Sequence, residues 1–274
     1  MDKSVSGLPQ EQIDEYWTNG YLSGIQILSS EQMEIARKKL IQLEHSELES
    51  DPNQWSSPDY LPWSDRKNSW WHWIKPMATH PKIIAAVRGI LGQNILIRNA
   101  DVFVKPAQSA RSINWHVDCT ADIYEADKML SVWFAISNSE PENGCMEFLP
   151  GSHRMPLPPN IKDKTTLSFA GTALERANSS ARESNIIQAG QISMHHFRTV
   201  HRSSGNTTSQ PRIGLVIRFM SSDASVETAE TGKAFLACGE NLPGHFSIQK
   251  NFPVTWKRSP NGDLQSSAKG ESID

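Results

Sequence analysis

From Ile95 onward the chain consists of short apolar runs separated by turn residues, and this feature constrains the fold more than any other. The dipeptides Asn143-Gly144 and Pro150-Gly151 supply turn chemistry between runs. The predicted strands are Ile95–Lys105, Trp115–Asp118, Met129–Ile136, Cys145–Leu149, Ile186–Gly190, Gln191–His196 and Ile213–Met220. A series of strands of this kind predicts a β-barrel or β-sandwich core.

Helical periodicity comes before these strands. Apolar residues follow i, i+3, i+4 spacing in three stretches, and Ser29 and Gln32 offer the capping residues of the second. The predicted helices cover residues 9–20, 29–49 and 81–92, with a short strand at residues 21–28. Helices first and strands afterwards predict an α+β fold, mainly β in its core, in which helical support at about residues 9–92 buttresses a barrel at about residues 95–220.

One domain accounts for most of the sequence. A length of 274 residues suits a single β-rich domain with a sizeable core, which we expect over residues 1–258, with a flexible tail at residues 259–274. Residues 51–75 are rich in Trp, Pro and Ser and are predicted to form a long loop. That loop either packs on the domain or serves as an active-site lid or wall. Residues 157–185 are predicted to be an irregular excursion over the barrel mouth.

Composition and charge exclude several classes of protein. Hydrophobic residues make up 38% and charged residues 21% of the chain, as in a globular protein. A net charge of -3 provides no basic surface for nucleic acid or an anionic membrane, and no apolar run approaches the roughly 18 residues of a membrane span. No signal peptide is expected, and three cysteines without a CxxC pair predict no disulfide framework. We therefore expect a cytoplasmic protein without nucleic-acid or membrane partners; its oligomeric state does not follow from the sequence.

A histidine and a carboxylate lie two positions apart in the segment Ile113-Asn-Trp-His-Val-Asp118. In a strand this spacing sends the side chains of His116 and Asp118 to the same face. One histidine and one carboxylate, joined by a distant second histidine, form the facial triad of non-haem Fe(II) oxygenases. We take His201 as that second histidine, because Arg212 follows it at the start of another β-like run.

Two other histidines are alternative ligands. His195 and His196 end a predicted strand, and alternation along it sends their side chains to opposite faces. At most one of them therefore faces the interior of the barrel. We interpret both as core residues or as supports of the metal ligands, although either one remains an alternative to His201.

Two arginines lie on the last predicted strand. Arg212 follows His201 by eleven positions, and its predicted role is a forked clamp on a carboxylate, with Ser203 as a further hydroxyl donor. Arg218 is interpreted as an ordinary surface arginine. His153, which follows a Pro-Gly turn, is expected to be exposed.

Several segments together resemble one protein family. They are Trp115-His-Val-Asp118, Val132-Trp133, Glu142-Asn-Gly-Cys-Met-Glu-Phe-Leu-Pro-Gly-Ser-His-Arg154, and His201-Arg-Ser203 with Asn206 and Arg212. In order and spacing this set resembles the phytanoyl-CoA dioxygenase family of Fe(II)/2-oxoglutarate-dependent oxygenases, over roughly residues 95–220. Residues 16–28 resemble the usual N-terminal opening of that family. No single segment is that specific.

The resemblance implies a double-stranded β-helix, the cupin-like jelly roll. It implies a small-molecule substrate and the cofactors Fe(II), 2-oxoglutarate as cosubstrate, and O2. The implied iron ligands are His116, Asp118 and His201. The implied 2-oxoglutarate contacts are Arg212, Ser203 and Trp133, with Lys67, Asn99 and Asp101 as looser candidates upstream.

The implied reaction is hydroxylation of a substrate C–H bond with decarboxylation of 2-oxoglutarate to succinate and CO2. Desaturation or cyclisation in natural-product biosynthesis is the alternative within the same chemistry. Related halogenases lack the carboxylate of the triad, so Asp118 disfavours halogenation. The aromatic residues of segment 55–73, Trp71 among them, together with Tyr124 and Lys67, predict a substrate pocket with aromatic walls, which favours a small polar or cationic metabolite.

Two other classes of protein compete with this interpretation. A cupin-like metalloenzyme without a cosubstrate would use the same triad but would not need the carboxylate clamp at Arg212. A non-enzymatic ligand-binding jelly roll would have no reason to keep three metal ligands. The combination of His116, Asp118 and His201 with Arg212 therefore favours the oxygenase.

Overall fold

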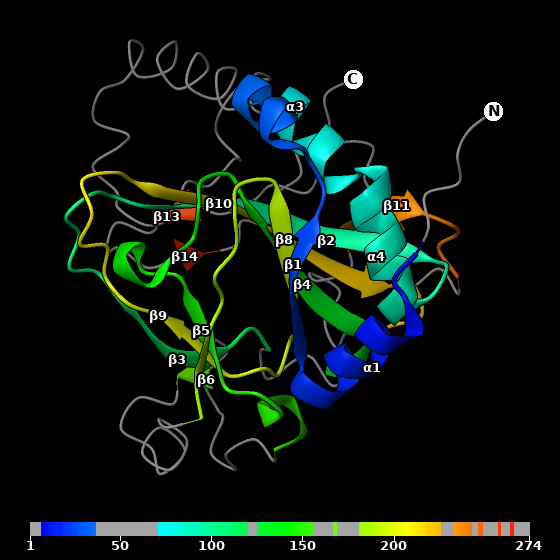
Figure 1. The fold of residues 1–274 in the computed structure, drawn as a ribbon. Coiled ribbons are helices and arrows are strands. Elements are labelled where there is room, and N and C mark those ends of the chain that lie inside the picture. Colours follow the sequence, from blue (N-terminus) through cyan, green and yellow to red (C-terminus); the bar gives the residue numbers. More distant parts are fainter. Residues whose placement is uncertain are drawn as a thin grey trace.

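The computed structural model describes residues 7–36, 71–119, 125–155, 167–168, 181–225, 233–242, 246–248, 257–258 and 264–265. In Figure 1 two antiparallel layers of strands face each other, and helices cover the outer side of the larger layer. This is the predicted α+β arrangement with a jelly-roll core.

The larger layer is a seven-stranded sheet with the order β1-β8-β4-β10-β2-β11-β12. Its strands are β1 (Tyr21–Gln26), β2 (Ile95–Lys105), β4 (Met129–Ala135), β8 (Gln191–His196), β10 (Arg212–Ser221), β11 (Lys233–Cys238) and β12 (Ser247–Ile248). All pairs are antiparallel except β11 with β12. Every residue of β4 is buried, because this strand lies in the middle of the sheet between the helices and the second layer.

The smaller layer is a five-stranded sheet with the order β6-β3-β9-β5-β7. Its strands are β3 (Ile113–Val117), β5 (Met146–Phe148), β6 (Leu167–Ser168), β7 (Glu183–Ser184) and β9 (His201–Ser203). A separate pair joins β13 (Lys257–Arg258) to β14 (Leu264–Gln265).

Helices pack on the outer face of the larger sheet (Figure 1). They are α1 (Gln10–Asn19), α3 (Trp71–Ala78) and α4 (Pro81–Leu91), and short 3-10 helices occupy η3 (Ala126–Lys128), η4 (Pro141–Asn143) and η5 (Ser152–Arg154). Ile83 and Val87 of α4 are fully buried in one apolar cluster with residues of β2, β4, β8 and β10. Burial of this apolar surface fixes the helices to the sheet and leaves its other face for the site.

Strand β10 shows how the two faces of the larger sheet differ. Leu215, Ile217 and Phe219 belong to the apolar cluster under the helices. Because side chains alternate along a strand, Arg212 and Arg218 lie on the opposite face, toward the smaller sheet. The interior between the two sheets therefore receives charged residues from the same strand that supplies the apolar core.

Most predicted elements are confirmed, and the long ones agree closely. The strands predicted at Ile95–Lys105 and Gln191–His196 have those bounds, and the helices predicted at 9–20 and 81–92 match α1 and α4. The capping of the second helix is confirmed, since Gln32 N donates to Ser29 Oγ and Ser29 N donates to Gln32 Oε1. Residues 30–36 of that helix are described.

Two predictions of local structure were wrong. Trp71–Ala78, assigned largely to a long loop, forms the helix α3. Ile186–Gly190 is not a strand, because Ile186 is exposed and Gly190 has a φ of +90°; only Ile187 makes an isolated bridge, to Ser139. Leu264–Gln265, in the predicted tail, pairs with Lys257–Arg258; the flexibility of the tail stays a prediction.

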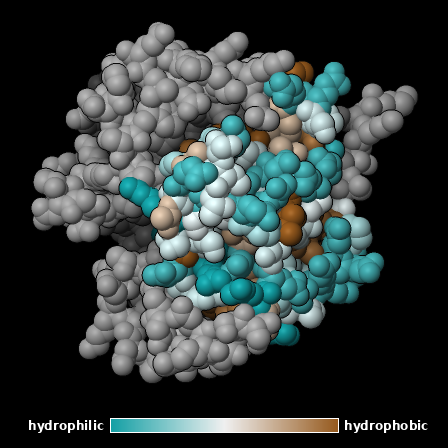
Figure 2. All heavy atoms as spheres, turned by 60° about the vertical axis from the view of Figure 1, so that its left-hand side comes forward, coloured by the Kyte–Doolittle hydropathy of each residue, from teal (hydrophilic) through white to brown (hydrophobic). Residues whose placement is uncertain are grey.

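The described part of the surface in Figure 2 is mostly hydrophilic, with apolar side chains scattered over it. Among the described helices none is both long and apolar enough to cross a membrane. All three cysteines are thiols in the structure.

Candidate metal and cosubstrate site

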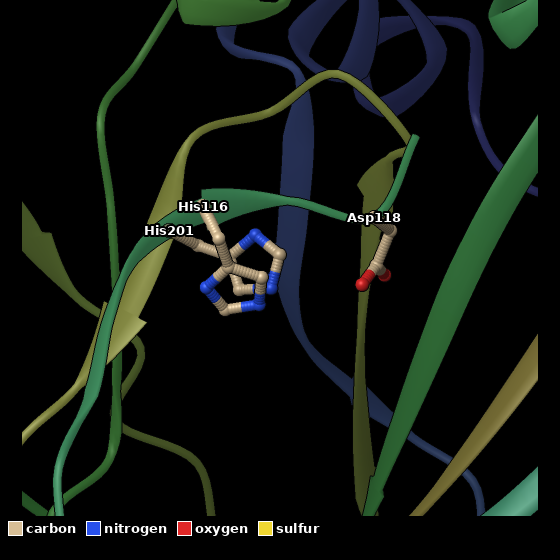
Figure 3. A group of neighbouring side chains, drawn as sticks. All are labelled: His116, Asp118 and His201. Atoms are coloured by element: carbon tan, nitrogen blue, oxygen red, sulfur yellow. The ribbon is translucent and has the colours of Figure 1, made fainter. Parts of the chain in front are cut away.

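Three potential metal ligands converge between the two sheets (Figure 3). His116 on β3, Asp118 just after β3, and His201 on β9 each offer one ligand atom, and these atoms lie within 4.8 Å of one another. β3 and β9 are neighbours in the smaller sheet, and His116 stands directly opposite His201 in their pairing. The imidazole centroids are 4.0 Å apart. The predicted triad is thus brought together by strands more than eighty residues apart in sequence.

Backbone carbonyls orient both imidazoles. The Nδ1 atom of His116 lies 2.8 Å from the carbonyl oxygen of Asn114, and the Nδ1 atom of His201 lies 2.9 Å from that of Thr199. A carbonyl can only accept, so each Nδ1 carries the hydrogen and each Nε2 keeps its lone pair for a metal.

Asp118 connects the two sheets. It follows β3 of the smaller sheet, but its carboxylate contacts residues of the larger one: Ser131 Oγ donates to Oδ2 at 2.5 Å, and His195 Nε2 lies 3.1 Å from the same oxygen. Oδ1 lies 3.8 Å from a guanidinium nitrogen of Arg218. This contact corrects the interpretation of Arg218 as a surface residue, since β10 directs its side chain inward.

The electrostatics favour a charged carboxylate beside neutral imidazoles. Burial by itself raises the pKa of Asp118, but the Arg218 guanidinium and the His195 hydrogen bond outweigh it and hold the pKa well below its usual range. Burial, together with its histidine neighbours, holds the pKa of His201 well below its usual range, and burial lowers the pKa of His116. Two neutral imidazoles and one carboxylate are a donor set that fits Fe(II).

A small hollow is formed by residues of β2, β3 and β10, and β3 also carries His116. It is lined by Phe103, Val104, Lys105, Arg111, Ile113 and Arg212, and its empty volume is about 230 Å³, open solvent included. Ser203 is two residues beyond His201 on β9, a distance of about 7 Å along a strand, and points to the same side. Lys105 Nζ donates to Ser203 Oγ at 3.0 Å and also to the carbonyl oxygens of Ser204 and Arg111.

Trp133 and Arg212 pack against each other at this end of the site. The Arg212 guanidinium carbon lies 4.8 Å from the centroid of the Trp133 ring, and both side chains are buried. Arg212 also donates to the carbonyl oxygen of Gly144 at 2.5 Å. A Cβ atom on Gly214 would lie 2.1 Å from the Trp133 ring, so only glycine leaves room for this arrangement.

The structure separates the other predicted cosubstrate residues. Asn99 on β2 is paired with Arg218, near Asp118, and Asp101 is paired with Val216, between the two arginines. The lysine at the hollow is Lys105, which was not among the predicted cosubstrate residues. It lies directly opposite Arg212 in the pairing of β2 with β10. That pairing was the signal that could have found it, because residues directly opposite share a face.

Lys67 and Tyr124 lie outside the described residues, and Trp71 is described only as the first residue of α3. Of the alternative ligands, His195 faces the site, whereas His196 faces away and binds Asp127 at 3.0 Å. His153 was expected to be exposed but is buried, with its Nε2 atom 3.1 Å from the carbonyl oxygen of Trp17.

Comparison with known proteins decides the family. The sequence profile described as "Phytanoyl-CoA dioxygenase (PhyH)" matches residues 16–214. The chain belongs to this family. The resemblance drawn from the motifs is therefore confirmed, and the start of the match at residue 16 agrees with the resemblance of residues 16–28.

Relatives of the chain differ in their named reactions. A probable alpha-ketoglutarate-dependent hypophosphite dioxygenase of Stutzerimonas stutzeri is 28% identical over 157 residues, which are 55% of this chain and 54% of that protein. An ectoine dioxygenase of Streptomyces avermitilis is 25% identical over 158 residues, 51% of this chain and 53% of that protein. The chain thus spans about half the length of the curated relatives it matches.

Solved structures show the same fold. The non-heme monooxygenase ThoJ superposes with a TM-score of 0.70 at 21% identity, covering 89% of both chains. The alpha-ketoglutarate-dependent carbocyclase SnoK from nogalamycin biosynthesis superposes with a TM-score of 0.64 at 21% identity, covering 83% of this chain and 89% of that one. At such identities the likeness concerns the fold alone, and it agrees with the predicted cupin-like jelly roll.

Proposed function

We propose that this protein is an Fe(II)- and 2-oxoglutarate-dependent dioxygenase that hydroxylates a C–H bond of a small molecule. The observation that carries the proposal is the pairing of a His116–Asp118–His201 ligand set with an arginine-lined hollow that shares strand β3 with it. Membership of the PhyH family and the names of its relatives support the same reaction class.

The three ligand residues suit an octahedral ion. Each offers one atom, so together they would hold the metal and leave three coordination positions for a chelating cosubstrate and O2. When bound, the iron and 2-oxoglutarate supply the oxidising chemistry, with succinate and CO2 as products of the cosubstrate. The protein holds the imidazoles in the metal-binding tautomer through Asn114 and Thr199, and keeps Asp118 charged.

The hollow suits the distal end of 2-oxoglutarate. Arg212 supplies a planar fork that matches a carboxylate, Ser203 supplies a hydroxyl, and Lys105 adds a second cation. The short distance from His201 to Ser203 along β9 allows one C5 dicarboxylate to reach the metal and the hollow together. This geometry favours the oxygenase over a metalloenzyme without a cosubstrate.

Hydroxylation is the reaction we propose, since the Asp118 carboxylate would take the coordination position that halogenases leave open. A desaturation or cyclisation is the second candidate, because SnoK, a carbocyclase, shares the fold. We further propose that the protein acts in the cytoplasm and that residues 1–258 form one functional domain.

A substrate screen under 18O2 tests the proposal. Candidate small molecules, with amino acids, their derivatives and small oxyanions among them, are incubated with Fe(II) and 2-oxoglutarate. We expect one class to raise succinate formation and to gain one 18O atom, and Asp118→Ala to abolish both signals. Normal hydroxylation by Asp118→Ala would remove Asp118 from the ligand set. Product that forms without consumption of 2-oxoglutarate would favour the enzyme without a cosubstrate.

A further inference from the structure

A row of polar residues crosses the larger sheet beneath Asp118. Ser131 on β4 stands directly opposite His195 on β8 and directly opposite Arg218 on β10. All three side chains reach the carboxylate of Asp118, which comes from the other sheet. Each of three adjacent strands thus contributes one polar side chain, from directly paired positions, to the surroundings of the Asp118 carboxylate.

The contacts divide unequally between the two carboxylate oxygens. Oδ2 receives the Ser131 hydroxyl at 2.5 Å and lies 3.1 Å from His195 Nε2, whereas Oδ1 has Arg218 only at 3.8 Å. A carboxylate oxygen offers about two acceptor positions. Two donors occupy those of Oδ2, so Oδ1 is the oxygen left for a metal.

We propose that His195 is a positioning residue, which together with Ser131 holds Asp118 so that Oδ1 alone faces the metal. The proposal rests on the proposed function, because it presupposes a metal at His116, Asp118 and His201. A monodentate Asp118 leaves three positions of an octahedral ion open, whereas a bidentate one would take a position needed by 2-oxoglutarate or O2.

The chemistry of the imidazole supports this role. Asp118 is charged and can only accept, so His195 Nε2 must donate. The Nδ1 atom of His195 is buried and makes no hydrogen bond within the described part of the chain. The ring is itself fixed by packing, since its centroid lies 5.4 Å from that of Phe148 and 4.7 Å from that of His201. His195 therefore has a single polar task, the bond to Asp118.

The chain offers a matched control in the neighbouring histidine. His196 is as buried as His195 and is next to it on β8, but its side chain faces away from the site and binds Asp127. Removal of His196 tests the general cost of losing a buried histidine from this strand, without changing the contacts of Asp118.

Anaerobic titration with Co(II), followed by 2-oxoglutarate, tests the proposal without any turnover. We compare the wild type with His195→Phe, His195→Gln, Ser131→Ala and His196→Phe, and measure metal affinity, the ligand-field spectrum and the thermal unfolding of each apoprotein. We expect His195→Phe to weaken Co(II) binding about 10- to 100-fold and to alter the spectrum. We expect His195→Gln, whose amide can donate from the position of Nε2, to restore both, and His196→Phe to bind Co(II) like the wild type.

Several outcomes would overturn the inference. They are wild-type affinity and an unchanged spectrum in His195→Phe, an equal loss in His195→Gln, or an equal loss in His196→Phe. Should His195→Phe not fold, Ser131→Ala decides, because loss of the other Oδ2 donor must weaken Co(II) binding in the same direction. A wild-type protein that binds no Co(II) would overturn this inference and the proposed function together. If the wild type binds Co(II) and the His195 and Ser131 variants bind it equally well, only this inference is overturned.

Discussion

Lys105 is a buried cation at the end of the site farthest from the proposed metal. Its ammonium donates to the neutral oxygens of Ser203, Ser204 and Arg111, and Arg212 lies directly opposite it on the neighbouring strand. Two cations that share a face of neighbouring strands attract an anion. Lys105 and Arg212 together therefore suit the distal carboxylate of 2-oxoglutarate.

We predict that Lys105→Met weakens 2-oxoglutarate binding about 10- to 100-fold, because a hydrogen bond to a charged group contributes about 1.5–3 kcal/mol. Metal affinity should change little, since Lys105 does not contact the triad. Isothermal titration of the apoprotein with Co(II) measures metal affinity, and titration of the Co(II)-loaded protein with 2-oxoglutarate measures cosubstrate affinity. Lys128→Met, which removes a lysine paired with Glu125 and Asp223 outside the hollow, is the control. Unchanged 2-oxoglutarate affinity in Lys105→Met would exclude Lys105 from the cosubstrate site.

Single residues show what the sequence could and could not predict. The spacing of His116 and Asp118 indicated a shared side of a strand, and the structure brings both to His201. The interpretation of Arg218 as a surface residue was wrong. Alternation along the strand places Arg218 on the same face as Arg212, but it does not reveal that Asp118 lies opposite that face. The contact of His195 with Asp118 depends on two sheets meeting, which no local pattern encodes.

Among the elements, β10 carries both the core and the site. Its outward residues pack under the helices, and its inward residues Arg212, Gly214 and Arg218 shape the interior. Gly214 leaves no space for a side chain, because the Trp133 ring lies over it and Arg212 stacks on that ring. Residue 214 must therefore be glycine for the Trp133 ring to keep the position in which Arg212 packs on it.

We predict that Gly214→Ala destabilises the protein by about 1–3 kcal/mol, since the added methyl group overpacks the interior. It should also weaken 2-oxoglutarate binding, because Trp133 must move and Arg212 with it. Urea unfolding and a 2-oxoglutarate titration measure the two effects. The comparison variant is Gly89→Ala in α4, where the new Cβ would meet only the Leu8 side chain at 3.3 Å or more and where alanine favours the helix. Equal stability of Gly214→Ala and Gly89→Ala would contradict this account.

Element length decided which predictions succeeded. β2 and β10 are long and show alternation, and α4 has clear helical spacing and a proline at its start, so their patterns predicted them. β9 has only three residues, and its ladder with β3 and β5 depends on distant sequence. α3 was missed because a Trp-rich segment with Pro76 lacks the usual helix signals, although tertiary packing overrides such propensities.

At the scale of the whole molecule, the site exists because two sheets are held at a fixed separation. β3 and β9 of the smaller sheet supply the histidines, and β4, β8 and β10 of the larger sheet supply the contacts that hold Asp118. An apolar cluster of Tyr21, Trp133, Met146, Phe148 and Val216 joins the two sheets next to the triad. The family motifs predicted this assembly, whereas composition and periodicity indicated only a β core.

The measurement that tests the central claim most directly is an anaerobic titration of the apoprotein with Fe(II) and then with 2-oxoglutarate. A chelate of 2-oxoglutarate on iron gives a weak visible charge-transfer band. We predict that the wild type develops this band, that His201→Ala does not, and that Arg212→Ala requires a much higher 2-oxoglutarate concentration. Metal binding without any band would contradict the proposed cosubstrate, and a band that persists in His201→Ala would contradict the proposed ligands.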